Sequence, residues 1–384
     1  MAKIDELLQE LCPDGVEWKT LGEVSNLSRG KVYSKSYITN NAGSYPVYSS
    51  QTKNEGVLGN ISTFDYDGEF LTWTTDGAYA GSVFHRNCKF SITNVCGLIK
   101  LTSDSISYRF LYYWLSIHAK EYVYEGMGNP KLMTNQMISV TIPLPPLPIQ
   151  QHIVEVLDTF TDAISNLEEE LALREKQFGF YRESILSFEN ESVDWTPISE
   201  LGQIIRGNGL QKKDFVQEGV GCIHYGQIYT KFGLSTSYTL SFVDAKLADK
   251  LTKVDPGNLV IACTSENVDD LCKSVVWLGN TTIVTGGHAC VLKHKENAKY
   301  IGYCFTSNSF QSQKKKFAYG TKVLDIKKDK LGEIKIPVPS LERQQEIVEI
   351  LDTFEATIAN IKEEISLRTK QYEYYREKLL SFGN

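Results

Sequence analysis

Hydrophobic positions recur every three or four residues over two long stretches of the chain. Charged residues fill the flanks between them, as in Glu168-Glu169-Glu170. An alternation of three and four that holds for about five heptads is typical of a coiled-coil helix. Two amphipathic helices of about 60 Å each are therefore predicted, over residues 149–190 and 341–384. Their apolar seams begin with Ile153, Leu157, Phe160 and Ile164 in the first helix, and with Ile347, Leu351, Phe354 and Ile358 in the second.

The two helical stretches are copies of one another. The segment Leu157-Asp158-Thr159-Phe160 returns unchanged as Leu351-Asp352-Thr353-Phe354, and the match extends to both sides without a gap. The stretches that precede the helices correspond more loosely: Trp18, Arg29-Gly30, Lys35 and Tyr48 align with Trp195, Arg206-Gly207, Lys212 and Tyr225. A tandem duplication follows. Its four parts are a first globular domain (1–148), a first helix (149–190), a second globular domain (191–340) and a second helix (341–384).

A single amphipathic helix of this length cannot bury its own seam. The other copy in the same chain is the nearest partner, and the long stretch between the copies favours an antiparallel pairing that ends near Met1. This arrangement would be pseudo-two-fold and nearly circular; pairing between two chains stays open as an alternative. Each helix follows a proline-rich segment, Ile142-Pro143-Leu144-Pro145 or Ile336-Pro337-Val338-Pro339, which we expect to form a rigid joint because proline cannot continue a strand ladder.

The two globular stretches read as mixed structure. Short apolar runs predict strands at 68–74, 95–100, 258–263 and 289–293, while helices are predicted around 108–122 and 300–317. The predicted fold class is therefore α+β, with two mixed α/β domains joined by two long antiparallel helices that form an intramolecular coiled coil.

Signals of catalytic chemistry are sparse. The chain has no GxxxxGK[ST] phosphate loop, its eight cysteines form no CxxC pair, and its six histidines show no metal-ligand spacing. The triplet Asn129-Pro130-Lys131 lacks the second proline and the aromatic residue of the amino-methyltransferase motif. These observations favour a binding protein without catalytic residues, a metal or a cofactor of its own.

The net charge of -7, from 40 Lys+Arg and 47 Asp+Glu, argues at first against a nucleic-acid binder. Divided at residues 150, 190 and 340, however, the chain carries -2, -6, +4 and -3, so the helices hold -9 and the globular domains +2. The acidic surplus therefore lies on the helices. No apolar run approaches the ~18 residues of a membrane helix and no signal-peptide stretch is present, so a cytoplasmic protein without membrane contact is expected.

Basic residues in the globular domains cluster with aromatic and polar ones, including a group around Lys314-Lys315-Lys316. Lys and Arg can hold phosphates, while base edges are read by Arg, Lys, Asn, Gln, Ser or Thr. Any one of these side chains could equally be an ordinary solvated residue. The candidate DNA contacts are Arg29, Lys31, Lys35, Tyr48, Ser50, Arg206, Lys212, Lys213, Tyr225, Gln227, Lys322 and Lys327.

Two variable domains that alternate with two near-identical helices, each preceded by an Ile-Pro-x-Pro-x-Leu-x-x-Gln-Gln-x-Ile-Val segment, resemble the specificity subunits of type I restriction-modification systems. The resemblance covers essentially the whole chain. It implies a non-catalytic subunit in which each domain reads one half of a bipartite, asymmetric target in double-stranded DNA. The helices would set the spacing and dock two methyltransferase subunits.

The same resemblance implies that restriction/translocase subunits join through the complex, and that S-adenosylmethionine and ATP belong to the partner subunits. The alternative from a different class is a cytosolic coiled-coil scaffold with two protein- or carbohydrate-binding domains.

Overall fold

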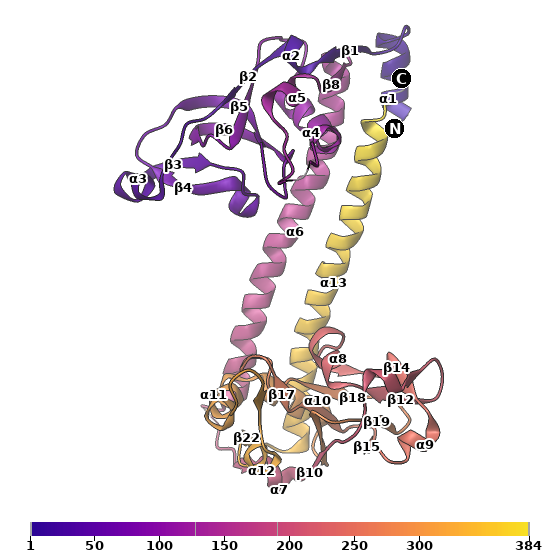
Figure 1. Ribbon diagram of the computed structural model, residues 1–384. Helices are drawn as coiled ribbons and strands as arrows, with labels where there is room; N and C mark the ends of the chain where they lie inside the picture. The colour runs from indigo at the N-terminus through magenta and orange to yellow at the C-terminus, as the bar shows by residue number, and fades with distance from the viewer. Residues whose placement is uncertain (1, 127, 190, 383–384) are drawn as a thin grey trace. The chain divides into compact units, whose positions relative to one another are not determined.

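The computed structural model describes residues 2–126, 128–189 and 191–382 and divides into two compact units (Figure 1). Unit 1 comprises 1–167 with 364–384, and unit 2 comprises 168–363. Each unit contains one mixed α/β domain and a part of both long helices, α6 (Leu147–Ser187) and α13 (Leu341–Leu379). The predicted fold class of two mixed domains with two long helices packed together is confirmed.

The domain of unit 1 is built on a six-stranded sheet with the strand order β2-β7-β5-β6-β3-β4. All of its neighbouring strands are antiparallel except β3 and β6. Its elements are α1 (Ala2–Leu11), β1 (Glu17–Thr20), α2 (Leu21–Val24), β2 (Ser25–Arg29), α3 (Lys35–Asn40), β3 (Ala42–Tyr48), η1 (Lys53–Gly56), β4 (Val57–Ile61), β5 (Tyr66–Thr74), β6 (Val83–Ile92), β7 (Cys96–Leu101), α4 (Tyr108–His118), η2 (Ala119–Tyr122), α5 (Thr134–Ile138) and β8 (Thr141–Leu144).

The domain of unit 2 contains two five-stranded sheets, with the orders β10-β20-β16-β18-β13 and β11-β14-β12-β19-β15. Its elements are β9 (Trp195–Pro197), α7 (Ile198–Leu201), β10 (Gly202–Arg206), η3 (Lys212–Asp214), β11 (Phe215–Val216), β12 (Val220–Ile223), α8 (Tyr225–Thr230), β13 (Ser235–Thr236), β14 (Ser241–Val243), α9 (Ala245–Ala248), β15 (Thr252–Val254), β16 (Leu259–Ala262), β17 (Thr264–Ser265), β18 (Ser274–Trp277), β19 (Ile283–Thr285), β20 (Ala289–His294), α10 (Ala298–Thr306), α11 (Asn308–Phe317), β21 (Leu324–Asp325), α12 (Lys328–Gly332) and β22 (Lys335–Pro337).

The proline-rich segments take part in strands, which corrects the prediction that they act only as joints. In unit 1, Pro143 of β8 lies opposite Trp18 of β1, and in unit 2, Pro337 of β22 lies opposite Trp195 of β9. Each pair forms a separate two-stranded antiparallel sheet. Proline is tolerated there because a strand at a sheet edge need not donate from every backbone nitrogen. The repeated tryptophan and the repeated Ile-Pro therefore close each domain at the point where its helix begins.

The core of each unit is shared between its domain and its helix segments. In unit 1, Phe110 and Tyr113 of α4 are fully buried in one cluster with Leu157 of α6 and Leu379 of α13. Ile4 of α1 belongs to the same cluster, so the two ends of the chain lie together, as the repeat predicts (Figure 1). In unit 2, the equivalent cluster joins α10 and α11 to the beginning of α13 and to Leu186 of α6.

The two helices run antiparallel and pair through equivalent residues in each unit. In unit 1 the Phe160 ring stacks on Tyr375, with centroids 5.3 Å apart and an angle of 21° between the ring planes. In unit 2 the Phe354 ring stacks on Tyr181 at 5.3 Å and 24°. Among the predicted seam residues, four are fully buried and four are half-buried. The buried ones are Ile153, Leu157, Ile347 and Leu351, and the half-buried ones are Phe160, Ile164, Phe354 and Ile358.

Candidate nucleic-acid interface

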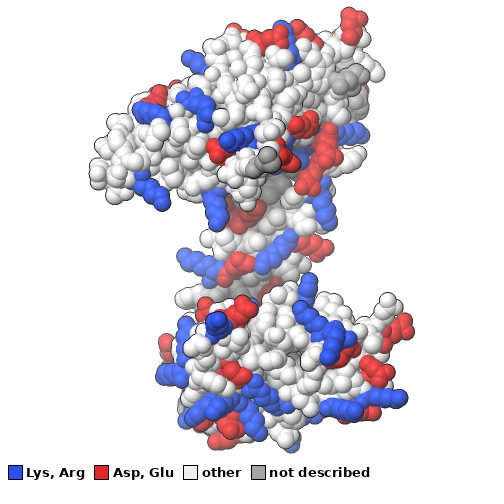
Figure 2. All heavy atoms as spheres, viewed as in Figure 1, with Lys and Arg blue, Asp and Glu red and all other residues white. Residues whose placement is uncertain are grey.

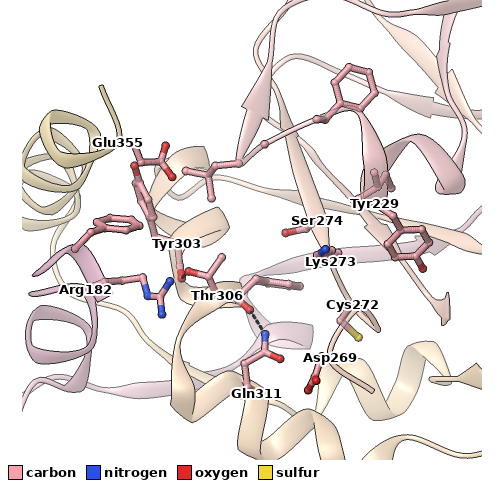
Figure 3. A pocket seen from close by; sticks show the side chains of 16 residues that line it. Arg182, Tyr229, Asp269, Cys272, Lys273, Ser274, Tyr303, Thr306, Gln311 and Glu355 are labelled. Atoms are coloured by element: carbon pink, nitrogen blue, oxygen red, sulfur yellow. Dashed lines mark hydrogen bonds between the residues drawn. The ribbon is translucent and has the colours of Figure 1, made fainter. Parts of the chain in front are cut away.

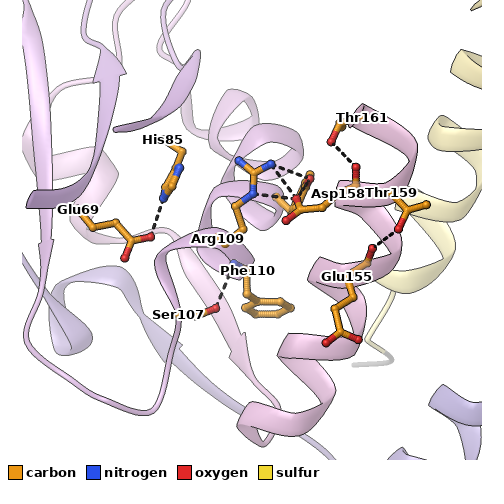
Figure 4. Close-up of polar contacts among 10 residues, drawn as sticks. Glu69, His85, Ser107, Arg109, Phe110, Glu155, Asp158, Thr159 and Thr161 are labelled. Carbon is orange, nitrogen blue, oxygen red and sulfur yellow. Dashed lines mark hydrogen bonds and ion pairs between the residues drawn. The ribbon is translucent and has the colours of Figure 1, made fainter. Parts of the chain in front are cut away.

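The aspartate of the repeated Leu-Asp-Thr-Phe segment anchors each domain to its helix. In unit 1, Arg109 Nε donates to Asp158 Oδ1 over 2.8 Å, and the Tyr113 hydroxyl donates to the same oxygen (Figure 4). In unit 2, Lys299 Nζ contacts Asp352 Oδ2 at 2.6 Å, and the Tyr303 hydroxyl donates to Asp352 Oδ1 over 2.8 Å. A basic residue and a tyrosine, four positions apart on α4 or α10, thus bind one carboxylate on α6 or α13.

The first glutamine of each Gln-Gln pair forms a second anchor. Gln150 is fully buried; its side chain accepts from the backbone nitrogen of Ser107, the residue that caps α4, and donates to the carbonyl oxygen of Pro145. Gln344 is also fully buried and makes the matching contacts with Asn297, which caps α10, and with Pro339. Each domain is therefore held to the start of its helix by a buried amide.

The predicted contacts of the first domain lie at or just after the end of β2, on α3, and at or just after the end of β3. Lys31 is exposed and forms an ion pair with Asp65 at 2.7 Å; this hydrogen bond raises the pKa of the Lys31 ammonium. Lys35 is exposed at the start of α3, and Ser50 is half-buried after β3. Arg29 is exposed, and its Nη2 donates to Thr75 Oγ1 over 3.3 Å.

Tyr48 differs from its neighbours because it is buried. The Arg86 guanidinium lies 3.6 Å from the centre of the Tyr48 ring, and burial raises the pKa of the Tyr48 hydroxyl to about 12. The sequence alignment pairs Tyr48 with Tyr225, but Tyr48 is the buried last residue of β3, while Tyr225 begins α8 and is half-buried. The two domains have diverged at this point, and a contact of Tyr48 with DNA stays a prediction.

The predicted contacts of the second domain fall into two groups. Lys212 and Lys213 are exposed on η3; Lys212 lies close enough to His224 to help lower its pKa, after the larger effect of burial. Gln227 has a local structural role, because its amide donates to Ser241 Oγ and accepts from the His224 backbone. The second group lies in or around residues 319–325 and comprises Arg206, Tyr225, Lys322 and Lys327.

One member of the basic group on α11 is a core residue. Lys314 is fully buried, and its ammonium donates to the carbonyl oxygens of Asp269 and Leu271 over 3.1 and 2.8 Å. Burial lowers the pKa of this ammonium. Lys314 is therefore not part of the charged surface that the sequence suggested, whereas Lys315 and Lys316 are exposed.

The second domain also has an exposed closed loop that the sequence did not indicate. Tyr319 and Asp325 exchange two backbone hydrogen bonds, of 3.1 and 2.8 Å, and so close residues 319–325 into a hairpin. Strand β21, in one arm of this hairpin, pairs with β17, which follows the central strand β16. Arg206 makes a bidentate contact with Asp325 at the base of the hairpin, with Nη1 3.1 Å from Oδ1 and Nη2 2.6 Å from Oδ2. These hydrogen bonds raise the pKa of Arg206.

The first domain contains an equivalent hairpin. Tyr124 and Lys131 exchange backbone hydrogen bonds of 2.8 and 3.1 Å, and Lys131 also bridges to Asp76, just after β5. The residue that follows each hairpin donates its backbone N–H to a carbonyl oxygen in an equivalent place: Leu132 to Thr75 in the first domain, and Ile326 to Cys263 in the second. Arg29, the repeat equivalent of Arg206, reaches the Thr75 side chain next to this hairpin. Both domains carry an Arg-Gly pair whose arginine is the last residue of a sheet strand, Arg29 in β2 and Arg206 in β10, but this pair alone does not indicate a hairpin.

The glycine of that pair is required by close backbone packing. A Cβ atom on Gly30 would lie 1.9 Å from the Ile92 carbonyl oxygen, and one on Gly207 would lie 2.0 Å from the Gly286 carbonyl oxygen. Only glycine allows this approach without a shift of the backbone. The two domains thus share the arginine, the glycine and the hairpin, although their sequences have drifted.

Unit 2 contains a cavity beside the hairpin 319–325 and another at the junction between the domain and its helices. One, of about 360 Å³, lies beside the hairpin and is lined by Tyr225, Tyr229, Ser265, His288 and Val323 among others. The other, of about 340 Å³, lies where α6 and α13 meet the domain, and Arg182, Tyr303 and Glu355 face it (Figure 3). Burial raises the pKa of the Glu355 carboxyl.

On the face drawn in Figure 2, Lys and Arg side chains gather over unit 2, at the bottom of the view, with acidic side chains between them. Across the described ranges, no group of three or more His, Cys, Asp or Glu side chains could hold a metal ion. None of the described helices is long and apolar enough to cross a membrane.

Comparisons with known proteins agree with the duplicated layout. The sequence matches the type I restriction modification DNA specificity domain twice, over residues 13–174 and 192–367. The chain belongs to this family. It is 31% identical over 376 residues to a putative type I specificity subunit of Mycoplasma pneumoniae, covering 94% of this chain and 96% of that protein. It is also 38% identical over 173 residues to the specificity subunit of the type I restriction enzyme MpnII from the same organism, covering 44% of this chain and 52% of that subunit.

Solved structures show the same fold. The crystal structure of a type I restriction-modification S subunit from M. genitalium superposes with a TM-score of 0.62 at 15% identity, covering 96% of this chain and 97% of that one. A chain from a study of complex assembly and conformational transition in the type I system gives a TM-score of 0.59 at 15% identity, with the same coverage. The protein is thus a type I DNA specificity subunit, a non-catalytic member of its complex, and the cofactors of the reaction are carried by partner subunits.

Proposed function

We propose that each mixed domain of this specificity subunit reads one half of a bipartite, asymmetric target in double-stranded DNA. The observation that carries the proposal is the repetition of the complete anchor. The Asp158 and Asp352 contacts and the buried amides of Gln150 and Gln344 fix each domain to its helix in the same way. Two rigidly held readers of different sequence suit a target with two different halves.

The helices would act as the spacer between the two half-sites. With 41 residues in α6 and 39 in α13, each helix is about 60 Å long. One turn of DNA is about 34–36 Å, so a rod of this length would separate two readers by one to two turns. The acidic surplus of the helices supports the assignment, since negative charge is unfavourable next to phosphates.

The helices also carry two equivalent exposed apolar pairs that would dock two methyltransferase subunits. On α6, Leu173 and Phe180 are 68% and 69% exposed; on α13, Leu367 and Tyr374 are 52% and 58% exposed. The second pair is the repeat copy of the first, and its members are also seven residues apart, so each pair lies on one face of its helix. Apolar side chains that remain exposed at both copies favour one partner that binds twice.

The remaining subunits and cofactors would follow from this arrangement. Restriction/translocase subunits would join through the assembled complex, and S-adenosylmethionine and ATP would be bound by the partner subunits. The chain itself would contribute target selection and assembly.

Reconstitution with the methyltransferase subunit tests the DNA-reading role. The complex should bind duplex DNA in a sequence-dependent way, with an affinity that weakens as salt increases because neutralised phosphates release counterions. An affinity that neither depends on sequence nor weakens with salt would refute the proposal.

Native mass spectrometry tests the docking role. The wild-type chain should bind two methyltransferase subunits, Leu173→Ala with Phe180→Ala should leave one, and adding Leu367→Ala with Tyr374→Ala should leave none. Val216→Ala is a suitable control because Val216 is 42% exposed on β11, away from the helices. Retention of both partners by the fourfold variant would exclude these pairs as the docking surface.

A further inference from the structure

We propose that the hairpins 124–131 and 319–325 are the base-reading elements of the two domains, and that Arg206 is the positioning residue of the second. This inference rests on the proposed DNA-reading function and assigns it to particular loops. Exposed Asn129 and Lys131 in the first hairpin, and exposed Thr321 and Lys322 in the second, would contact base edges. Met127 lies outside the described residues.

Residues 319–323 of the second hairpin are exposed, but the base of the hairpin is held firmly. Its arm β21 is paired to β17, and Arg206 makes a bidentate contact with Asp325. The Tyr319 hydroxyl donates to Asp325 Oδ1 over 3.3 Å, and the Lys327 ammonium lies 5.7 Å from the centre of the Tyr319 ring. A loop that recognises bases must hold the residues at its tip in a fixed position. The ion pair between Arg206 and Asp325 at the base of the loop provides this constraint.

Large apolar side chains are also exposed in these loops. Tyr319 is 48% and Val323 58% exposed in the second hairpin, and Tyr124 is 65% exposed in the first. Tyr124 and Tyr319 occupy the same position, since each closes its hairpin by a pair of backbone hydrogen bonds. An exposed aromatic residue that recurs at one topological position in two diverged domains suits contact with a macromolecule.

The chemistry of the hairpins fits the major groove. That groove presents a different pattern of donors and acceptors for each base pair. Lysine can donate to guanine O6 and N7, asparagine can pair with adenine N6 and N7, and threonine can contact several bases. The tips differ in sequence between the two domains while their frames are alike. This difference is expected if the tips select bases and the frames present them.

Arg206 acts through Asp325 rather than on DNA. Both of its terminal nitrogens are engaged by that carboxylate, and Nη1 also lies 3.4 Å from the Ile326 carbonyl oxygen. This placement reassigns a residue that the sequence suggested as a DNA contact. Arg29 makes a weaker version of the contact through Thr75, so the first hairpin depends less on its arginine.

The test uses the complete methyltransferase complex, produced in a host without other adenine or cytosine methylation, with the methylated motif mapped genome-wide. Thr321→Ala with Lys322→Ala should relax or change the half-site read by the second domain, with a loss of discrimination there of about 10-fold or more. The other half-site and the spacer should stay as in the wild type. Lys315→Ala is the matched control, since it removes an exposed charge of the same sign from the same domain outside the hairpin.

Asp325→Asn tests the positioning role. It keeps the size of the side chain and removes the charge that holds Arg206, so it should relax the same half-site without touching any base. A fall in overall methylation with an unchanged motif would contradict this role. Arg206→Lys, which retains a charge but not the bidentate geometry, should give an intermediate motif.

The outcomes separate this proposal from the proposed function. If the wild-type complex methylates no sequence-specific motif, the proposed function fails. If the wild type has a bipartite motif that the Thr321 and Lys322 double variant leaves unchanged, or alters in both halves, only the assignment to the hairpin is overturned.

Discussion

The Tyr303 hydroxyl donates a hydrogen bond of 2.8 Å to Asp352 Oδ1, and so ties α10 of the second domain to α13. Tyr113 makes the same contact with Asp158 in unit 1. Both aspartates belong to the repeated Leu-Asp-Thr-Phe segment, and their neighbouring basic partners, Arg109 and Lys299, differ in type but not in place. The residues that join domain to helix are therefore among those that the duplication has kept alike.

Replacing Tyr303 by phenylalanine should destabilise unit 2. The change removes one hydrogen bond to a carboxylate while Lys299 keeps its ion pair, so a loss of about 1.5–3 kcal/mol in the free energy of unfolding is expected. For a unit of this size that corresponds to a fall in Tm of about 3–12 °C. Thermal unfolding followed by circular dichroism measures it. Tyr374→Phe, on the exposed surface of α13, should leave Tm unchanged. An equal fall in Tm in both variants would show that the hydrogen bond between Tyr303 and Asp352 does not stabilise unit 2.

The buried amide should matter more than its exposed neighbour. Gln150→Ala leaves the Ser107 backbone nitrogen and the Pro145 carbonyl without their partner, and each buried unpaired group costs about 1–3 kcal/mol. Gln151→Ala removes only an exposed contact with Glu155. Limited proteolysis and thermal unfolding of the two variants should therefore differ clearly. Similar behaviour of both would contradict the anchoring role of Gln150.

The stability of unit 2 should depend on pH through Glu355. Burial raises the pKa of this carboxyl above its ordinary value, so the folded state binds the proton more tightly than the unfolded state. The stability that the folded state gains by binding this proton is complete below the ordinary pKa of the carboxyl, and it is lost as the pH rises through the raised pKa. Glu355→Gln should thus increase Tm near pH 7 and have little effect near pH 4. Glu363→Gln, exposed on the same helix, is the control. A Tm gain for Glu355→Gln that is the same at both pH values would argue against titration of this group.

Lys212 and Lys213 should contribute affinity rather than sequence preference. Both are exposed on η3, where they can reach phosphates. If each neutralises one phosphate, Lys212→Ala with Lys213→Ala should reduce the slope of log K against log salt by about 1.8. Fluorescence anisotropy of the reconstituted complex over a salt series gives this slope. As a control, Lys362→Ala removes a helix charge that is paired with Glu175. A change in the preferred sequence without a change in slope would reverse the assignment.

The helices could be predicted closely because their pattern is local. Heptad spacing in residues 149–190 and 341–384 determines where an amphipathic helix begins, and α6 and α13 begin at Leu147 and Leu341. The strands at 66–74 and 289–294 were also found, since a buried strand shows as a short apolar run. The helix predicted over 300–317 is interrupted at Ser307, which ends α10 and caps α11.

The hairpins could not be predicted because they depend on contacts between distant parts of the chain. Arg206 meets Asp325 across 119 positions of sequence, and β17 pairs with a strand about 60 residues away. Nothing local indicates either contact. The burial of Lys314 could not be predicted for the same reason. The residue resembles a surface charge in the sequence, but its buried ammonium donates to backbone carbonyls of a distant loop. Charge and residue type suggested which side chains could contact DNA, while the tertiary contacts decide which of them are exposed.

A chain that carries its first domain twice tests the central claim most directly. Residues 191–340 would be replaced by a second copy of residues 1–148, joined at the equivalent Ile-Pro strands, and the methylated motif of the reconstituted complex would be mapped. If each domain reads one half-site, the new motif should contain the first wild-type half-site twice, as an inverted repeat because the helices run antiparallel, with the spacer retained. A motif that still contains the second wild-type half-site, or one without two separated halves, would contradict the account.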